Sequence, residues 1–379
     1  MKKRQRFFPA ASTPQSRPGI AHLRDTMGMD TSQLADWWAE LWPDHRPTRL
    51  LEIPALARLT GVARVFVKVE GERPLGSFKA LGGMTAGLRA LAKAIGTNDL
   101  WELCSANICR ALPPLICASE GNHGLAVAAG AQRARTKALV YLPFGVSTAR
   151  AERIQACGGE IVWVSGTYDD AVLAAEAAAT HGDGLLISDT SSDPDSPVVA
   201  DVMAGYGLLA QELVHQFRDE VRDRPSHLFV QAGVGGLAAA MVDGLQSLLR
   251  APDQFLIVEP ESAPCVARAL AAEHAVRIEG DLKTSAEMLA CGVASAPALR
   301  ILRQHSVQPV LVPEAELKLA ATCLLNVGGV HTTASGAAGL AGLLRSATTP
   351  ELRASHQLDA DSIVLLIATE GAASTDAEH

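Results

Sequence analysis

Hydrophobic residues follow two different periods along this chain. Residues 64–70 (RVFVKVE) alternate as a half-buried strand does. After Ser77, apolar residues recur three and four positions apart as far as Ile95, which predicts a helix with one buried face. Further strands are predicted at 115–118, 138–143, 160–164, 184–188, 227–231, 254–259 and 362–368, and further helices at 126–134 and 149–158. Strands and helices are therefore expected to alternate.

The predicted fold class is α/β. Most of the strands are apolar on both faces and several are separated by helices, which is typical of parallel sheets covered by helices on each side. A chain of 379 residues is long enough for about two domains. No repeat or low-complexity linker marks a boundary, so we expect intertwined domains. Residues 96–114 are predicted to form an irregular surface segment.

Composition and charge exclude some classes of partner. The chain is 48% hydrophobic, so it can bury a large core, and its net charge is -8. A negative surface with only 4% aromatic residues argues against nucleic acid and against an anionic membrane surface. No apolar run is long enough to span a membrane. Pro9 interrupts the basic start, so we interpret it as a flexible arm and not as a signal peptide.

The cysteine pattern favours free thiols. Their number is odd and no CxxC pair occurs, which argues against disulfides and against a zinc site. We therefore expect a reducing, cytoplasmic location and no metal site. The cysteines are Cys104, Cys109, Cys117, Cys157, Cys265, Cys291 and Cys323.

One lysine occupies an unusual place, in the stretch GSFKALGG (76–83). Lys79 follows a predicted strand and stands at a helix start, between a serine and a pair of glycines. Lysines usually lie on solvated faces, where no such setting is needed. A lysine held at this point could instead attack a carbonyl group.

A glycine-rich turn follows another strand, in QAGVGGLAAAMVDGL (231–245). Glycines allow backbone N–H groups to approach an anion, and the N-terminus of the following helix adds positive potential. The stretch has neither the GK[ST] of a Walker loop nor the GxGxxG spacing of a dinucleotide site. It is consistent with a phosphate cradle or with a tight turn that permits close packing.

Polar side chains crowd a third turn, SEGNHGLAVAAG (119–130). Glu120, Asn122 and His123 lie between glycines, after a strand and before a helix. An Asx turn and helix cap would explain Asn122, and local hydrogen bonds would explain His123. The carboxyl end of a strand is also where α/β sheets bind ligands, which favours a site.

Together these stretches resemble the pyridoxal-phosphate enzymes of the tryptophan synthase β, or fold-type II, group. Within that group the chain is most similar to the diaminopropionate ammonia-lyases, over about 74–371. Shorter similar stretches occur in the same order: VYLPFG (140–145), YDDAV (168–172), SDT (188–190), AGYGLLAQE (204–212), IVEPESAPC (257–265), LACG (289–292), SGAAGL (335–340) and TEG (369–371).

The resemblance implies a role for each residue of a pyridoxal 5'-phosphate site. Lys79 would form the Schiff base with the cofactor and then act as a base, which calls for a lowered lysine pKa. Two acids, Glu120 and Asp189, would serve the two enantiomers or the leaving amine. The implied cofactor-binding residues are Phe78, Lys79, Asn122, Gly233, Val234, Gly235, Gly236, Leu237 and Thr369. Ser77, Ser119, Gly121 and His123 would receive the substrate carboxylate.

The resemblance implies a lyase that removes the α-proton and the 3-amino group of a small amino acid. Diaminopropionate would give pyruvate and ammonia, and a neutral hydroxyl at Thr369 beside the pyridine nitrogen suits elimination. The alternatives are a dehydratase of serine, threonine or 3-hydroxyaspartate, a β-replacement synthase, and a non-catalytic relative. The chain departs from the lyases at three places: Ala334 and Ala368 replace polar residues, and 191–197 replaces an aromatic-acidic segment.

The resemblance also implies an architecture. Two doubly wound α/β domains would hold the cofactor in the cleft between them. The large domain would comprise 1–82 and 191–379, with 1–45 as an N-terminal arm, and 83–190 would form a small inserted domain. A homodimer is usual for the group.

Overall fold

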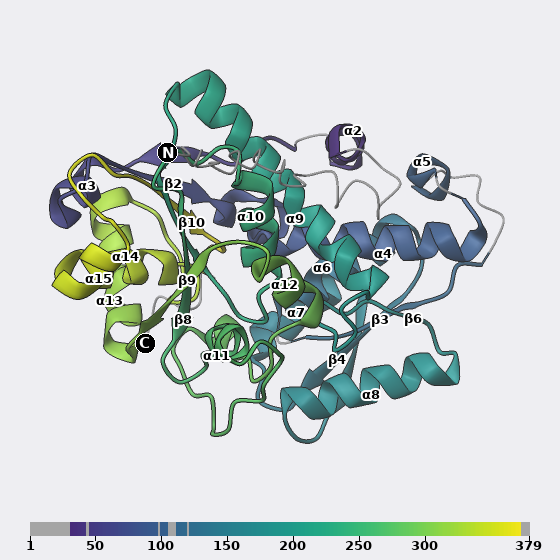
Figure 1. Ribbon diagram of the computed structural model, residues 1–379. Helices are drawn as coiled ribbons and strands as arrows, with labels where there is room; N and C mark the ends of the chain where they lie inside the picture. The colour runs from purple at the N-terminus through teal and green to yellow at the C-terminus, as the bar shows by residue number, and fades with distance from the viewer. Residues whose placement is uncertain (1–30, 43–44, 98, 105–110, 120, 373–379) are drawn as a thin grey trace, which may run out of the picture.

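The computed structural model describes residues 31–42, 45–97, 99–104, 111–119 and 121–372. It contains two sheets, which lie toward opposite ends of the molecule (Figure 1). The larger sheet has the order β1 (Leu50–Glu52), β2 (Arg64–Val69), β10 (Ile363–Ala368), β7 (His227–Gln231), β8 (Gln254–Pro260) and β9 (Val307–Val312). The smaller sheet has the order β5 (Gly159–Val164), β4 (Ala138–Pro143), β3 (Leu115–Ala118) and β6 (Leu185–Leu186). All neighbouring strands are parallel except β1 and β2, so the α/β prediction is confirmed.

Helices connect the strands and cover the sheets. In chain order they are α2 (Thr31–Leu41), α3 (Pro54–Thr60), α4 (Lys79–Ile95), α5 (Leu100–Cys104), α6 (Asn122–Arg133), α7 (Thr148–Ala156), α8 (Tyr168–His181), α9 (Pro197–Gln216), α10 (Gly236–Leu245), α11 (Cys265–Ala272), α12 (Ala296–Leu302), α13 (Glu314–Gly328), α14 (Ala338–Thr348) and α15 (Pro350–Ser355). Short helical turns are η1 (Glu70–Glu72), η2 (Pro74–Gly76), η3 (Phe217–Val221) and η4 (Glu287–Leu289). None of the described helices is long and apolar enough to cross a membrane.

Strand β10 shows why the central strands are continuously apolar. Leu365 and Ile367 belong to a core shared with α4, α9 and α10, whereas Val364 and Leu366 belong to a core shared with α3, α13 and α14. Successive side chains of a strand point to opposite faces, so both faces of β10 are buried. The larger sheet is therefore covered on both sides, as the apolar pattern predicts.

Helices α4 and α9 pack closely against each other. Gly205 of α9 faces the backbone of α4, where a Cβ atom would lie 2.2 Å from the carbonyl oxygen of Leu81. Gly82 of α4 in turn faces the ring of Tyr206, and a Cβ atom added to Gly82 would lie 2.4 Å from the nearest ring carbon. Glycines thus allow α4, which begins at Lys79, to lie directly against α9.

Three expectations about local structure need correction or were incomplete. The segment 96–114 is not irregular throughout, because 100–104 forms α5, with Leu100 and Leu103 buried. The strand predicted at 184–188 is only two residues long. The sequence pattern missed β1, which has three residues, and β9, an edge strand interrupted by Pro309. Proline has no backbone N–H to donate to a neighbouring strand. It is tolerated in an edge strand because one side of that strand has no neighbour.

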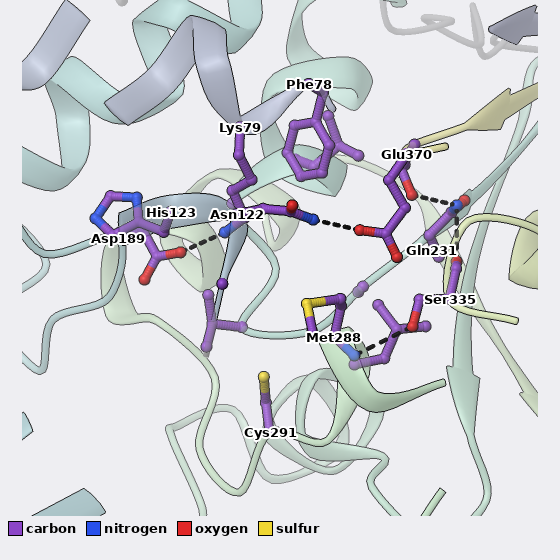
Figure 2. A pocket seen from close by; sticks show the side chains of 18 of the residues that line it. Phe78, Lys79, Asn122, His123, Asp189, Gln231, Met288, Cys291, Ser335 and Glu370 are labelled. Atoms are coloured by element: carbon purple, nitrogen blue, oxygen red, sulfur yellow. Dashed lines mark hydrogen bonds and ion pairs between the residues drawn. The ribbon is translucent and has the colours of Figure 1, made fainter. Parts of the chain in front are cut away.

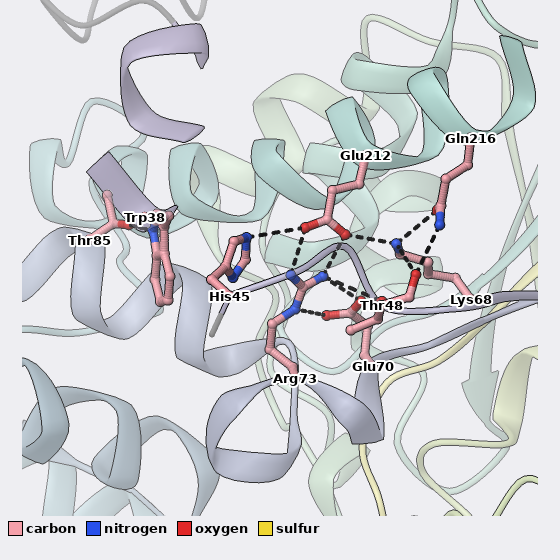
Figure 3. Close-up of polar contacts among 9 residues, drawn as sticks. All are labelled: Trp38, His45, Thr48, Lys68, Glu70, Arg73, Thr85, Glu212 and Gln216. Carbon is pink, nitrogen blue, oxygen red and sulfur yellow. Dashed lines mark hydrogen bonds and ion pairs between the residues drawn. The ribbon is translucent and has the colours of Figure 1, made fainter. Parts of the chain in front are cut away.

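A buried group of charges joins the segment before β1 to α9 (Figure 3). Glu212 of α9 accepts hydrogen bonds from Lys68 Nζ at 2.7 Å and from Arg73 Nη1 at 2.6 Å. Arg73 also pairs with Glu70 at 2.7 Å, and Lys68 donates to the carbonyl oxygen of Thr48 at 2.9 Å. Lys68, Glu70 and Arg73 are buried, so each charge depends on its partners to offset lost hydration.

Candidate active site

The predicted site residues meet in one cavity of about 120 Å³ (Figure 2). It lies at the carboxyl ends of parallel strands from both sheets. Ser119 follows β3, Gly233 follows β7, Thr369 follows β10, and Asp189 comes shortly after β6. Parallel α/β sheets place ligands at this edge because loops and helix N-termini converge there.

Backbone hydrogen bonds join the stretch GSFK to the stretch TEG, although the two are far apart in sequence. The N–H of Phe78 donates to the carbonyl oxygen of Thr369 at 3.1 Å. The N–H of Gly371 donates to the carbonyl oxygen of Gly76 at 3.0 Å. Lys79 and Thr369 are therefore held on one side of the cavity by main-chain contacts.

The Lys79 amine forms an ion pair with the Asp189 carboxylate. Burial disfavours the charge on Lys79, but the carboxylate of Asp189 outweighs this effect and raises the lysine pKa. For Asp189, burial is likewise outweighed by the nearby ammonium group, and the pKa is lowered. The expectation of a lowered lysine pKa is thus wrong for the free amine, because the sequence did not reveal how close Asp189 lies.

The loop at 233–237 has the geometry of an anion cradle. Gly235 has φ +98°, a left-handed conformation that favours glycine, and a Cβ atom there would lie 3.2 Å from Val266. Helix α10 begins at Gly236, so its first N–H groups have no partner within the helix and its N-terminus is positive. Gly233, Val234, Gly235, Gly236 and Leu237 all line the cavity.

The turn that begins α6 is organised by Ser119. Its Oγ accepts hydrogen bonds from the N–H groups of Gly121 at 3.0 Å and Gly124 at 2.8 Å. The hydroxyl proton of Ser119 therefore stays available to a ligand. Asn122, the first residue of α6, donates through Nδ2 to the carboxyl group of Glu370.

His123 is buried in the cavity wall. Its Nε2 lies 2.8 Å from the carbonyl oxygen of Ile187, and its Nδ1 has no hydrogen-bond partner. Burial lowers the His123 pKa, which favours the neutral ring. A carbonyl oxygen can only accept, so the single ring proton lies on Nε2 and Nδ1 offers a lone pair. In this state His123 cannot donate to a substrate carboxylate, the contact that the resemblance implies.

The structure brings most predicted residues together. Lining the cavity are Phe78, Lys79, Ser119, Gly121, Asn122, His123, Asp189, Gly233, Val234, Gly235, Gly236, Leu237 and Thr369. The Phe78 ring packs on Tyr206, with ring centroids 4.9 Å apart. Ser77 is buried and does not line the cavity, and Glu120 lies outside the described residues.

Sequence reasoning missed several residues of the cavity wall. They include Tyr206, Gln231, Met288, Cys291, Ser335 and Glu370. Gln231 and Glu370 had a detectable signal, because each is a polar residue at or just after the end of a buried strand. Cys291 lies in LACG (289–292), one of the stretches similar to the lyases, whereas Met288 had no signal because it comes from a segment with no regular period. Among the described residues, no group of three or more His, Cys, Asp or Glu side chains could hold a metal ion.

Gln231 supports the hydroxyl group of Thr369. Its Nε2 lies 3.1 Å from Thr369 Oγ1 and 3.0 Å from the carbonyl oxygens of Gly336 and Ile367. The amide nitrogen can only donate, so Thr369 Oγ1 accepts in this contact. The hydroxyl proton of Thr369 is thereby left for an acceptor in the cavity.

Comparison with known proteins extends these observations. A family profile described as pyridoxal-phosphate dependent enzyme matches residues 41–370. The chain is 32% identical over 348 residues to diaminopropionate ammonia-lyase of Escherichia coli (strain K12), covering 88% of this chain and 86% of that protein. It is 28% identical over 284 residues to the human serine dehydratase-like protein, covering 75% and 77%.

Known structures show the same similarity. A crystal structure of the Escherichia coli diaminopropionate ammonia-lyase in complex with D-serine matches with a TM-score of 0.82 and 29% identity. The match covers 93% of this chain and 91% of that one. The fold, the cavity and the family profile agree, and this chain belongs to the pyridoxal-phosphate dependent enzymes of fold type II.

Proposed function

We propose that this protein is an ammonia-lyase that converts 2,3-diaminopropionate to pyruvate and ammonia. The observation that carries the proposal is the joint presence of Lys79, Asp189 and the 233–237 cradle in one cavity. Similarity to an Escherichia coli enzyme of that name over 88% of the chain supports the choice of substrate.

The residues present fit pyridoxal phosphate. The N-terminus of α10 and the Gly233–Leu237 amides would hold the phosphate, and Asn122 and Thr369 would contact the ring. Lys79 would hold the cofactor covalently. When bound, the cofactor supplies an electron sink that acidifies the α-carbon of the substrate.

The ion pair of Lys79 and Asp189 supplies the acid-base groups. In the loaded enzyme the substrate amino group would take the place of Lys79 on the cofactor, which would release the lysine as a neutral amine near the Asp189 carboxylate. Either group can then remove the α-proton. We place Glu120 as the second acid for the opposite enantiomer, as the resemblance implies.

The turn at 119–123 would hold the substrate carboxylate. Ser119 has a free hydroxyl proton, because its oxygen already accepts from Gly121 and Gly124. Backbone N–H groups at the start of α6 add positive potential. With its proton on Nε2, His123 would not donate to the carboxylate, so the Ser119 hydroxyl and the backbone N–H groups of the turn would hold it.

A second candidate is a dehydratase of a hydroxy amino acid. It is favoured by the similarity to the human serine dehydratase-like protein, which covers 75% of this chain. Such a reaction would use the same cavity, with water in place of the second ammonia as leaving group.

Keto-acid release by the purified, cofactor-loaded protein tests the proposal. The substrates are D- and L-2,3-diaminopropionate, D- and L-serine, L-threonine and 3-hydroxyaspartate, each without a second substrate. Rapid pyruvate formation from diaminopropionate is expected. Turnover of a hydroxy amino acid with none of diaminopropionate would favour the dehydratase, and a requirement for an added nucleophile would indicate a synthase.

We also infer the assembly and its setting. A cytoplasmic location is consistent with the lack of disulfide bonds among the described cysteines, and a homodimer is usual for the group that the chain resembles. The smaller domain would comprise 83–190, which contain every strand of the four-stranded sheet. Light scattering after size-exclusion chromatography would measure the mass, and a monomer would contradict the dimer.

A further inference from the structure

A buried carboxyl group without a cationic partner lines the cavity. Glu370 is 7% exposed and follows Thr369 at the end of β10. It accepts hydrogen bonds from Asn122 Nδ2 and from Thr333 Oγ1, the latter at 2.5 Å (Figure 2 shows the former). Both donors are neutral. No described lysine, arginine or histidine lies within ion-pair distance of Glu370. Arg150 and Lys79 act on its charge from farther away, and each is already paired with another acid, Glu287 and Asp189 respectively.

Glu370 can accept further hydrogen bonds from a ligand. A carboxylate has about four acceptor positions, and the two neutral donors use two of them. Glu370 lines the main cavity and also a neighbouring one of about 50 Å³, so its carboxyl group faces ligand space. Burial raises the Glu370 pKa, and the hydrogen bonds from Thr333 and Asn122 and the more distant charges of Arg150 and Lys79 offset this only in part.

The other acid of the described cavity wall is already paired. Asp189 binds the Lys79 amine, and Figure 2 shows Glu370 on the other side of Lys79 from Asp189. Glu259 is also buried, but its oxygens accept from the N–H groups of Val266 and Ala267, and it does not line the cavity. In the proposed reaction Asp189 serves the Lys79 amine and the α-proton, so Glu370 is the described acid of the cavity wall that is left for a second cation.

We propose that Glu370 binds the distal ammonium group of the substrate and selects an amino over a hydroxyl leaving group. The assignment rests on the proposed function. A carboxylate beside the distal nitrogen favours the ammonium form. When the carbon–nitrogen bond breaks, the electron pair stays on nitrogen and neutral ammonia leaves without a further proton. A hydroxyl group lacks the positive charge and must gain a proton to leave as water.

The test compares Glu370→Gln with the wild type on 2,3-diaminopropionate and serine, which differ only in the distal group. Glutamine keeps an oxygen acceptor for Asn122 and removes the charge. The kcat/KM for diaminopropionate should fall roughly 10- to 100-fold, the size of one hydrogen bond to a charged group. The kcat/KM for serine should change little. The matched control is Glu160→Gln, because Glu160 is an exposed acid paired with Lys137, neither residue lines either cavity, and its loss should leave both values nearly unchanged.

Binding provides a readout that does not depend on turnover. Titrations followed by the absorption of the bound cofactor would use L-2,4-diaminobutyrate, which has a distal amine but no amino group at the β carbon, and L-alanine. Glu370→Gln should weaken only the former, about 10-fold or more. If Glu370→Gln does not fold, Glu370→Asp replaces it in the test. Aspartate keeps the charge on a shorter side chain, so kcat/KM for diaminopropionate and the affinity for diaminobutyrate should fall, while the values for serine and alanine should not.

The outcomes separate two failures. A wild-type protein that is inert toward diaminopropionate overturns the proposed function and this assignment with it. A wild type that is active, with equal losses on diaminopropionate and serine in the variant, overturns the Glu370 assignment alone.

Discussion

The Lys79 amine and the Asp189 carboxylate form an ion pair, although the two residues are 110 positions apart in the sequence. Lys79 begins α4 and Asp189 follows the smaller sheet. The Asp189 charge raises the Lys79 pKa and the Lys79 charge lowers the Asp189 pKa, so both groups are ionised at neutral pH. In this pair the Lys79 amine carries the proton, and the Asp189 carboxylate lies next to it in the cavity.

Lys79→Ala should abolish keto-acid release and the visible absorption of a covalently bound cofactor. No other amine is expected to replace the lysine, because the attachment point is set by its place at the start of α4. Lys93→Ala is the matched control, since Lys93 is an exposed lysine on the same helix. An active Lys79→Ala protein would contradict the assignment.

Asp189→Asn and Glu120→Gln should impair different enantiomers of diaminopropionate. An acid on one side of the α-carbon can remove the proton of only one enantiomer, and loss of a positioned base lowers the rate by about 10²- to 10⁴-fold. The measurement is kcat/KM for the D and L substrates with each variant. Equal and small effects on both enantiomers would remove the two acids from the mechanism.

Glu212→Gln should destabilise the protein by about 3–5 kcal/mol, because it leaves two buried cations, Lys68 and Arg73, with only the Glu70 carboxylate to balance them. Urea unfolding followed by circular dichroism would measure the loss. The matched control is Glu160→Gln, whose exposed pair with Lys137 should contribute about 1 kcal/mol or less. Similar losses in the two variants would contradict the role of burial.

The effect of Glu212→Gln should shrink in acid. Burial opposes the charge of Glu212, but contacts with Arg73 and Lys68 outweigh it and lower the pKa below the ordinary value of 4.5. A carboxyl group with a lowered folded-state pKa stabilises the protein above its unfolded pKa, and this stabilisation is lost as the pH falls through the folded value. The difference in unfolding free energy between wild type and variant should therefore begin to shrink below the ordinary pKa of 4.5 and vanish only as the pH falls through the lower folded-state pKa. A difference that stays constant with pH would be inconsistent with this linkage.

Gly205→Ala should destabilise the protein by about 1–3 kcal/mol, because its new methyl group overlaps the α4 backbone at Leu81. The displaced α4 carries Lys79, so activity should fall as well. Gly207→Ala, on the same helix, is the matched control. An added Cβ there meets nothing within 4 Å, and alanine should stabilise the helix by up to about 1 kcal/mol. A loss of stability in both variants would indicate that contact with α4 is not the cause.

The sequence by itself determined the local structure and much of the chemistry. Continuous apolar runs predicted the central strands, because strands buried on both faces need no polar residues. Lys79, the 233–237 glycines and the 119–123 turn could be found because each follows such a strand. Weak periods hid β1, β9 and α5, where short length or an edge position removes the signal.

Only the tertiary structure decided which side chains meet. Lys79 pairs with Asp189, which raises the lysine pKa, and burial keeps His123 neutral. Both effects depend on distances between side chains that the hydrophobic pattern of the sequence does not encode. Glu370 could not be identified from the sequence for the same reason. Its burial and its lack of an ion-pair partner among the described residues are properties of the folded cavity. A local pattern determines which elements form, whereas charge and hydrogen bonding depend on neighbours that the chain brings together from remote positions.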